Sequence, residues 1–353
     1  MQEIVPLFLT HRFSHHSGVS GYDQFALRWA GLSRLLSFER PEAPQLDQSN
    51  ALSRVEYYCH AVRLQVVNWW LLCKMLSRTS PQANLMHVLY GEIDLPLPSS
   101  LLRRDIPVMA TIHQPLSHLT RSDARIAKLR RQLSCVDRVV ALCEEQRVFF
   151  AHLVGQERVC LIPHGVDTHF FHPGSEPRKR RVLIVGGWLR DWQLAERVLT
   201  AALRLRDDFH VRLVSPAADN PLRHLLPQER TEITGRLSDE ELLKEYQTCG
   251  VVFFPFRDAT ANNALLEACA CGCRIVAADV GGVRDYLGMS GMLFPPSTEP
   301  DRVAVMLMQS LDMAESEPYV PEAVARAASF DWREVERQLR TTYEFVLASG
   351  CRR

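Results

Sequence analysis

The sequence lacks an excess of charge of either sign and any long uninterrupted apolar run. Basic and acidic side chains balance at 41 each among 353 residues, so no overall charge recruits nucleic acid or an anionic membrane. The longest apolar stretch, LQVVNWWLLCKML, is interrupted by Asn68 and Lys74 and falls short of the roughly 18 consecutive apolar residues of a membrane span. The start of the chain lacks the basic flank and apolar core of a signal peptide, so we expect the mature protein to begin at Met1. These absences predict a soluble cytoplasmic protein with no transmembrane segment and no nucleic-acid partner, and they leave peripheral contact with a membrane open.

Motifs for metals and for common cofactors are also missing. None of the ten cysteines belongs to a Cys-x-x-Cys pair, and the alternation of Cys269, Cys271 and Cys273 at a helix end directs the thiols apart. Small buried thiols are therefore favoured over a zinc site. His11 and the adjacent histidines His15 and His16 lack the helical spacing and the carboxylate partner of metal ligands. Neither the dinucleotide fingerprint nor the Walker lysine-serine pair occurs, so we expect no metal and no cofactor.

Short β-branched runs alternate with longer helical patterns through most of the chain. The first series has strand patterns at 3–10, 85–90, 108–113 and 137–142 and helical patterns at 22–36 and 123–133. The second has strand patterns at 182–187, 210–215, 251–256 and 274–279 and helical patterns at 191–205, 238–249 and 261–270. This alternation predicts two α/β domains with doubly wound parallel sheets, joined near residues 168–178. The charged segment EPRKRR that follows is favoured as a solvated linker over a nucleic-acid contact.

Loops that follow strands are the expected ligand sites, because open α/β sheets bind ligands beyond the carboxyl ends of their strands. Gly18 and Gly21 lie near the start of a predicted helix, where their backbone amides can approach an anion; a plain flexible turn is the alternative. His113 ends the strand VMATIH and can donate to a sugar hydroxyl or serve as an ordinary polar contact. Glu92, after the neighbouring strand, is a weaker candidate for binding an acceptor hydroxyl.

The second half opens with the strand and loop VLIVGGWLRDWQL. Gly186 and Gly187 end the strand, and Arg190 lies at the start of the next helix. Two backbone amides, a helix dipole and a guanidinium together suit a diphosphate group. The alternative is an Arg190 that pairs with Asp191 or with solvent.

The stretch DATANNALLEACACG contains a single carboxylate, Glu267, in a helix that otherwise has the composition of a buried segment. Thr260, Asn262 and Asn263 can cap this helix, and its alanines let it lie close to neighbouring backbone or ligand. A buried carboxylate needs a partner, and a vicinal diol such as the two hydroxyls of a ribose donates two hydrogen bonds to it. Gly281–Gly282 after the next strand let another backbone segment reach the same site.

The order of these motifs resembles the retaining, nucleotide-sugar-dependent glycosyltransferases of family GT4, which have the GT-B fold. The resemblance rests on IPHGVDTHFFHP, on the glycine-rich strand end with its arginine, and on NNALLEACACGCRIVAADVGGVRDY. It extends to the terminal FDW and the helix EVERQLRTTYEFVLA, which in that family crosses back onto the first domain. It implies an acceptor domain at 1–172, a nucleotide-sugar donor domain at 173–330, and a C-terminal helix at 331–353 that packs on the first domain.

The resemblance also implies roles for individual residues. Glu267 matches the glutamate that binds the nucleotide ribose, and Arg190 matches the arginine on the donor diphosphate. His113 matches the histidine near the donor sugar. Gly18 and Gly21 resemble the acceptor-side glycine loop near the phosphates, and Gly187, in the glycine-rich strand end, is a further candidate for binding the nucleotide sugar.

Two departures from the family pattern fall on contacts to the sugar and the phosphates. The family carries two glutamates at a fixed spacing, and counting back from Glu267 puts Ala259 in the first position, with Asp258 one residue away. A lysine commonly follows the arginine, but here Asp191, Trp192 and Gln193 follow Arg190. Thr260, Asn262 and Asn263 are the residues left to hold the sugar.

The resemblance implies transfer of a sugar from a nucleotide donor to an acceptor hydroxyl with retention of configuration. No Asp-x-Asp pair occurs in the chain, so we expect Arg190 and helix N-termini, rather than a metal, to stabilise the leaving diphosphate. The expected acceptor is a glycan, a lipid-linked molecule or a small molecule. A catalytically weak or inactive sugar-nucleotide-binding subunit is the main alternative, and another GT-B enzyme such as an epimerase is a third.

Overall fold

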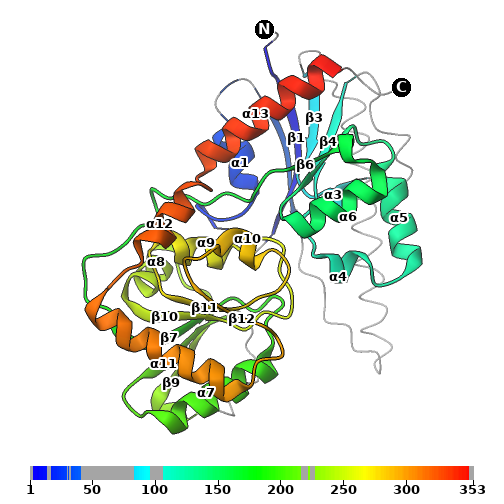
Figure 1. Ribbon diagram of the computed structural model, residues 1–353. Helices are drawn as coiled ribbons and strands as arrows, with labels where there is room; N and C mark the ends of the chain where they lie inside the picture. Colours follow the sequence, from blue (N-terminus) through cyan, green and yellow to red (C-terminus); the bar gives the residue numbers. More distant parts are fainter. Residues whose placement is uncertain are drawn as a thin grey trace, which may run out of the picture.

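The computed structural model describes residues 3–13, 17–29, 31, 33–40, 83–95, 106–215, 222 and 227–349. Within these residues each half of the chain forms a six-stranded parallel sheet with helices on its faces (Figure 1). Strands that alternate with helices give this arrangement because a parallel connection has to cross over a face of the sheet. The predicted α/β class with two doubly wound sheets is confirmed.

The first sheet has the strand order β2-β1-β3-β4-β5-β6. Its strands are β1 (Pro6–Phe13), β2 (Arg34–Arg40), β3 (Leu85–Val88), β4 (Val108–Thr111), β5 (Arg138–Ala141) and β6 (Val159–Leu161). The described helices of this half are α1 (Asp23–Arg28), α3 (Gly91–Asp94), α4 (Leu116–Leu119), α5 (Asp123–Leu133), α6 (Glu144–Val154) and the 3-10 helix η2 (Gln156–Arg158).

The predicted helix over 22–36 is wrong in its second half. Helix α1 ends at Arg28, Trp29 has a non-helical backbone, and Gly31 has a φ of +136°, which a right-handed helix does not contain. The chain then forms β2, which pairs in parallel with β1. Pairing with β1 satisfies the backbone groups on the outer side of that strand, and this tertiary contact overrides the local helical pattern.

The second sheet has the strand order β12-β11-β10-β7-β8-β9. Its strands are β7 (Lys179–Val185), β8 (His210–Val214), β9 (Thr231–Thr234), β10 (Cys249–Phe254), β11 (Ile275–Ala278) and β12 (Met292–Phe294). The helices of this half are α7 (Trp192–Leu205), α8 (Asp239–Thr248), α9 (Asn263–Ala270), α10 (Val283–Leu287), α11 (Pro300–Ser316), α12 (Pro321–Ala328) and the 3-10 helix η4 (Gln228–Arg230). The N-terminus of α8 has the capping box expected from the sequence, formed by Ser238 and Glu241.

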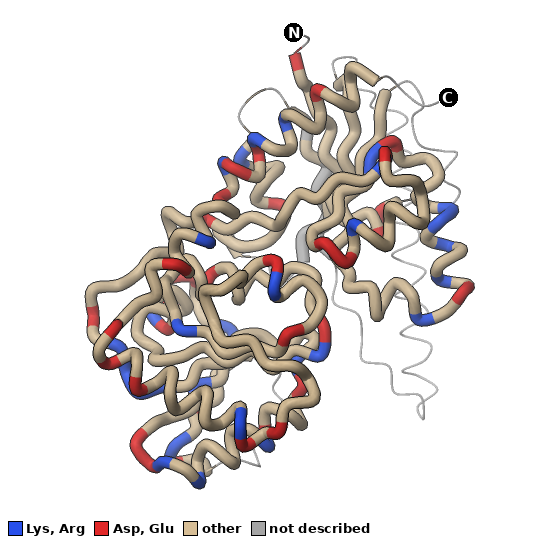
Figure 2. The backbone as a smooth tube through the Cα atoms, viewed as in Figure 1, with Lys and Arg blue, Asp and Glu red and all other residues tan. Residues whose placement is uncertain are grey.

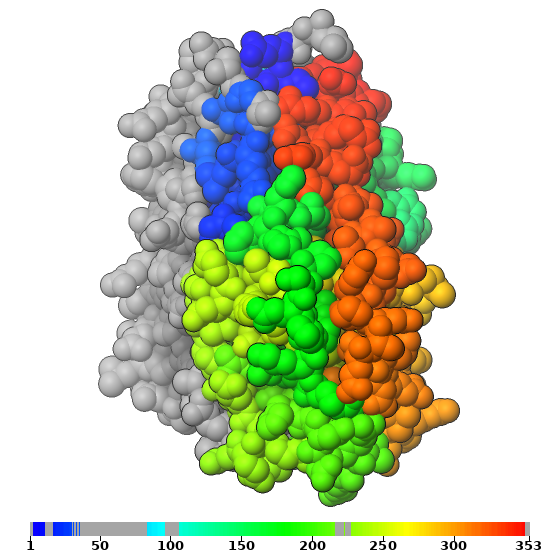
Figure 3. Space-filling view, turned by 90° about the vertical axis from the view of Figure 1, so that its left-hand side faces the viewer, coloured from blue at the N-terminus to red at the C-terminus, as the bar shows by residue number. Residues whose placement is uncertain are grey.

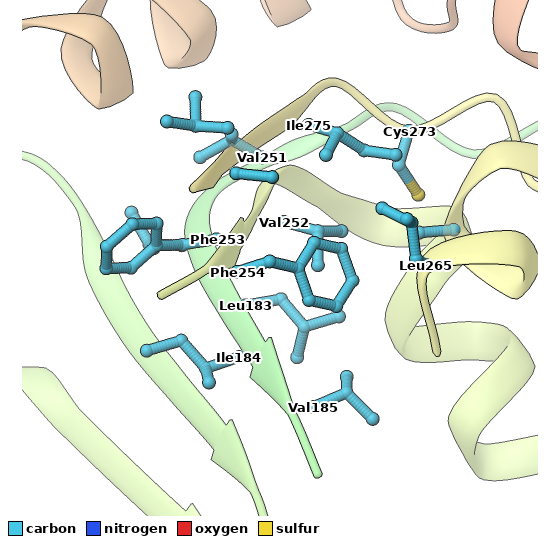
Figure 4. Packing of buried hydrophobic residues seen from close by; sticks show 14 of the residues in the cluster. Leu183, Ile184, Val185, Val251, Val252, Phe253, Phe254, Leu265, Cys273 and Ile275 are labelled. Atoms are coloured by element: carbon cyan, nitrogen blue, oxygen red, sulfur yellow. The ribbon is translucent and has the colours of Figure 1, made fainter. Parts of the chain in front are cut away.

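The core of the second half is built around β7 and β10, which are neighbours in the sheet. Every residue of β10 is buried, as expected for a parallel strand that is covered on both faces. Figure 4 shows Val251 to Phe254 of β10 beside Leu183 to Val185 of β7, with Leu265 of α9 close to them. Helix α9, which carries Glu267, is therefore held by this core.

The C-terminal helix α13 (Trp332–Ser349) returns to the first half, as expected (Figure 1). Its apolar face, which includes Trp332 and Leu339, shares a hydrophobic cluster with Phe8 of β1. The Tyr343 hydroxyl lies 2.6 Å from Nδ1 of His87, and burial lowers the pKa of His87 to about 3, so this ring stays neutral. The space-filling view in Figure 3 shows the red end of the chain beside the blue N-terminal residues.

Charged residues of both signs are interspersed over both halves (Figure 2). Arg180, for example, contacts Asp208, Asp312 and Glu315 at the surface. In the part of the chain that the structure describes, no helix combines the length and the apolar character that crossing a bilayer requires.

Candidate functional site

The loop after β1 meets helix α9 where the two halves face each other. The Ser20 hydroxyl donates to Glu267 Oε1 over 2.9 Å and accepts from the Asn263 side-chain amide over 3.1 Å. On the other side, the Tyr246 hydroxyl of α8 donates to Glu267 Oε2 over 2.9 Å. The carboxylate thus accepts one hydroxyl hydrogen bond from each half of the molecule.

Glu267 is only 4% exposed, in the interior of α9. Burial raises the pKa of Glu267 to about 7, while the hydrogen bonds from Ser20 and Tyr246 act in the opposite direction by stabilising the ionised form. The hydroxyls of Ser20 and Tyr246 are therefore the hydrogen-bond partners that this buried carboxylate requires.

A small cavity beside Glu267 leaves only about 10 Å³ for solvent, roughly one water molecule. Val19, Ser20 and Gly21 form one side of it, and Asn263 of α9 contributes to the other. A ligand larger than a water molecule does not fit this cavity in the present structure.

The predicted glycine loop is an ordered turn at this interface. The Ser17 hydroxyl accepts hydrogen bonds from the amides of Val19 and Ser20, and Gly21 has a φ of +115°, which favours glycine. A Cβ added to Gly18 would lie 3.7 Å from the carboxylate of Asp239 at the start of α8. Gly18 and Gly21 are thus brought close to the second half. His15, His16 and the side chain of His11 lie outside the described residues.

Asn262 and Thr260 precede α9. The Asn262 side chain caps the helix by accepting from the amide of Leu265, as expected. The Thr260 hydroxyl is buried and has no hydrogen-bond partner within the described residues. Gly282 is essential to the packing here, because an added Cβ would lie 2.2 Å from the Thr260 carbonyl oxygen. Asn262 is therefore occupied as a cap, whereas Thr260 retains a free hydroxyl.

His113 and Glu92, predicted separately, are brought together. The His113 amide donates to Glu92 Oε2 over 3.1 Å, and ring Nε2 donates to the Leu89 carbonyl oxygen over 2.8 Å. The ring packs between Tyr22 and Tyr90. Burial raises the pKa of Glu92 to about 7. His113 thus makes the ordinary polar contact that was its alternative interpretation, and its role near a sugar stays a prediction.

Arg190 differs from both interpretations of the sequence. Its side chain is 4% exposed and donates to the carbonyl oxygens of Val185 and Trp188, with the guanidinium 4.3 Å from the ring centre of Phe256. Asp191 instead caps α7 by accepting from the amide of Leu194. The guanidinium points into the second half and holds the loop after β7, so it is not presented to a ligand in this structure. Gly187 lies in that loop, next to Ser215.

Several contacts between the halves were missed from the sequence. Ser117 of the first half donates to Asp258 Oδ2, and the ring of His118 meets that of Trp188 at 5.3 Å. Ala259, in the place of the family glutamate, is buried, so the carboxylate one residue earlier is the one that reaches the interface. A hydroxyl or ring that pairs across two domains leaves no periodic signal in a sequence.

Within the described ranges, no three His, Cys, Asp or Glu side chains lie close enough to hold a metal ion. Cys269, Cys271 and Cys273 are buried free thiols, as the sequence favoured.

Two family models match the chain: "Glycosyltransferase Family 4" over residues 40–170 and "Glycosyl transferases group 1" over residues 179–312. A curated relative, the D-inositol 3-phosphate glycosyltransferase of Kribbella flavida, is 25% identical over 276 residues, which are 66% of this chain and 65% of the relative. The chain spans from about half to just under two thirds of the first curated relatives it matches.

Solved structures show the same fold. A sucrose-phosphate synthase from Thermosynechococcus elongatus superposes with a TM-score of 0.71 at 17% identity, covering 98% of this chain and 100% of that one. Anabaena HepE in complex with UDP-glucose superposes with a TM-score of 0.69 at 15% identity, covering 96% and 99%. The two facing parallel sheets and the returning α13 are those of the GT-B fold. Together with the two family models, they place this chain in glycosyltransferase family 4.

Proposed function

We propose that this protein transfers a sugar from a nucleotide-sugar donor to an acceptor hydroxyl, with retention of configuration and without a divalent metal. The observation that carries the proposal is the buried carboxylate of Glu267, which accepts one hydroxyl hydrogen bond on each oxygen. Two hydroxyls on one carboxylate is the arrangement that a ribose diol makes.

Ser20 is the hydroxyl that a ribose would replace. It lies on a loop of the opposite half, whereas Tyr246 is buried beside Glu267 in the same core. Burial has raised the pKa of Glu267 to about 7, so a diol that donates to Glu267 in place of Ser20 favours the ionised carboxylate and is favoured by it.

The relatives support a nucleotide sugar as the donor. Anabaena HepE was solved with UDP-glucose, and the Kribbella relative is named a glycosyltransferase that acts on an inositol phosphate. We carry over the donor class and leave the base, the sugar and the choice among glycan, lipid-linked and small-molecule acceptors to experiment. Free thiols among the described cysteines are typical of the reducing cytoplasm, where we place the reaction.

Charge on the leaving diphosphate would be met by backbone amides and hydroxyls. The N-termini of α7 and α9 follow Gly187 and Thr260, and the Thr260 hydroxyl has no partner within the described residues. Arg190 would take part only after its side chain had left Phe256. Transfer that survives exhaustive EDTA treatment, with the donor's anomeric configuration retained in the product by NMR, is the expected result. Activity that vanishes on chelation and returns with magnesium would overturn the metal-free mechanism.

A catalytically weak or inactive nucleotide-binding subunit is the second candidate. Ala259 in place of the first family glutamate and the inward-pointing Arg190 favour it. A thermal-shift screen with UDP, GDP, ADP and TDP, followed by turnover of the matching nucleotide sugars, separates the two. Binding without any transfer or hydrolysis supports the inactive subunit, and binding with turnover supports the transferase.

A further inference from the structure

Trp188 is an exposed aromatic residue that the site described above does not use. Its side chain is 64% exposed in the loop between β7 and α7, directly after Gly187. An exposed indole leaves a large apolar area in contact with water, which is unfavourable. A ligand that covers the indole removes this area from water and is favoured for that reason.

The backbone around Trp188 is strained and held in place. Leu189 has a φ of 55° and is alone in having a positive φ among the non-glycine residues that the structure describes. A leucine in this conformation is strained and persists where its surroundings enforce it. Two hydrogen bonds hold the backbone of this loop in place. The Arg190 side chain donates to the Trp188 carbonyl oxygen, and the Arg257 amide donates to the Leu189 carbonyl oxygen over 2.9 Å.

The ring projects toward the other half of the molecule. It meets the His118 ring of α4 at 5.3 Å, with the two ring planes at 85°, so the rings touch without stacking. Burial lowers the pKa of His118 below its ordinary value, with Arg121 acting in the same direction, which keeps the imidazole neutral and able to donate or accept. Asp258, whose charge acts on His118, accepts a hydrogen bond from the hydroxyl of Ser117, the residue before His118.

A pyranose ring has apolar C–H faces and a rim of hydroxyls, so it is bound by an aromatic face with polar groups around it. We propose that Trp188 is a platform for the C–H face of a pyranose, with His118 and Asp258 binding hydroxyls at its rim. This inference rests on the proposed function, since the ring belongs either to the donor or to the acceptor. Arg190 is then the residue that positions the platform.

The test is saturation-transfer NMR on the full chain with two sets of probes. One arm uses free glucose, mannose and N-acetylglucosamine, and the other uses UDP-glucose and GDP-mannose. In the Trp188→Ala variant we expect saturation of the pyranose C–H protons to fall about fivefold, because the stacked face is lost. Trp188→Phe should retain most of it. Phe345→Ala removes another exposed aromatic side chain, one that contacts Arg138, and should change nothing.

The two arms distinguish the source of the ring. Loss with the free sugars assigns the platform to the acceptor, and loss confined to the hexose protons of the nucleotide sugars, with base protons unchanged, assigns it to the donor. Equal saturation in wild type and Trp188→Ala, or no saturation of any pyranose in the wild type, overturns the platform. Nucleotide binding and turnover of the wild type judge the proposed function separately, so either can fail alone.

Discussion

The Tyr246 hydroxyl donates to Glu267 Oε2 over 2.9 Å, and both side chains are buried. Helix α8 thus holds the carboxylate of α9 in one orientation, which leaves Oε1 for a partner from the other half. In this structure that partner is Ser20.

Glu267→Gln should weaken binding of the nucleoside diphosphate alone as well as of its sugar conjugate. The expected loss is about 1.5 to 3 kcal/mol, typical of a hydrogen bond to a charged group. Calorimetry on the folded variant measures it. Glu240→Gln changes an exposed glutamate of α8 and is the matched control. Unchanged nucleotide affinity in a folded Glu267→Gln variant would remove the ribose role.

Tyr246→Phe should shift the pH dependence of nucleotide binding. The hydroxyl stabilises the ionised carboxylate, so its loss raises the pKa of Glu267 further above 7, and the pH at which affinity is half-maximal moves upward. Affinity measured from pH 6 to 9 checks this, with Tyr319→Phe as an exposed control. A uniform loss of affinity at every pH would indicate a packing defect instead.

Ser20→Ala should strengthen nucleotide binding, because a ribose would no longer have to displace a hydroxyl from Glu267 Oε1. The gain expected is about 0.5 to 1.5 kcal/mol, the net value of one hydrogen bond. Calorimetry at pH 8, above the pKa of Glu267, measures it. Weaker binding would mean that Ser20 itself contacts the nucleotide.

The free energy of unfolding should depend on pH because Glu267 is buried. The pKa of this group is raised in the folded protein from 4.5 to about 7, so its favourable contribution is complete below pH 4.5 and is lost as the pH rises to 7. The free energy of unfolding of wild type relative to Glu267→Gln should therefore fall over this window by on the order of 3 kcal/mol. Urea unfolding at pH 4.5, 6 and 8 measures it.

Glu92→Gln is the internal comparison for that measurement, because burial also raises the pKa of Glu92 to about 7. The free energy of unfolding of wild type relative to Glu92→Gln should also fall as the pH rises, but Glu92→Gln should not weaken nucleotide binding. A flat difference between wild type and Glu267→Gln would contradict burial of the ionisable group.

Arg190→Ala should lower the free energy of unfolding by about 2 to 4 kcal/mol, since it removes charged hydrogen bonds to one buried and one partly buried carbonyl oxygen. Nucleoside and nucleoside diphosphate should lose affinity equally. Chemical denaturation and calorimetry measure the two effects. A variant of wild-type stability that loses only diphosphate affinity would place Arg190 on the phosphates.

Local patterns in the sequence were sufficient for the class of fold and for most of the long elements. The buried strands β7 and β10, the capping box of α8 and the Asn262 cap of α9 follow from hydrophobic runs and short-range hydrogen bonds. The edge strands β9 and β12 were not predicted, because they are short and only partly buried and so lack the fully buried apolar run of the equally short β4. A helical pattern over 34–36 became β2, since pairing with β1 outweighed it.

At the site, local sequence patterns were enough to predict that a lone carboxylate lies in an apolar helix and that glycines follow the strands. The partners of this carboxylate come from tertiary packing: Tyr246 lies 21 residues away along the chain and Ser20 lies 247 away. It also turned Arg190 inward onto Phe256 and left Trp188 exposed. Hydrogen bonds and ring contacts between distant segments depend on how two sheets and their loops are placed, and no local periodicity encodes that placement.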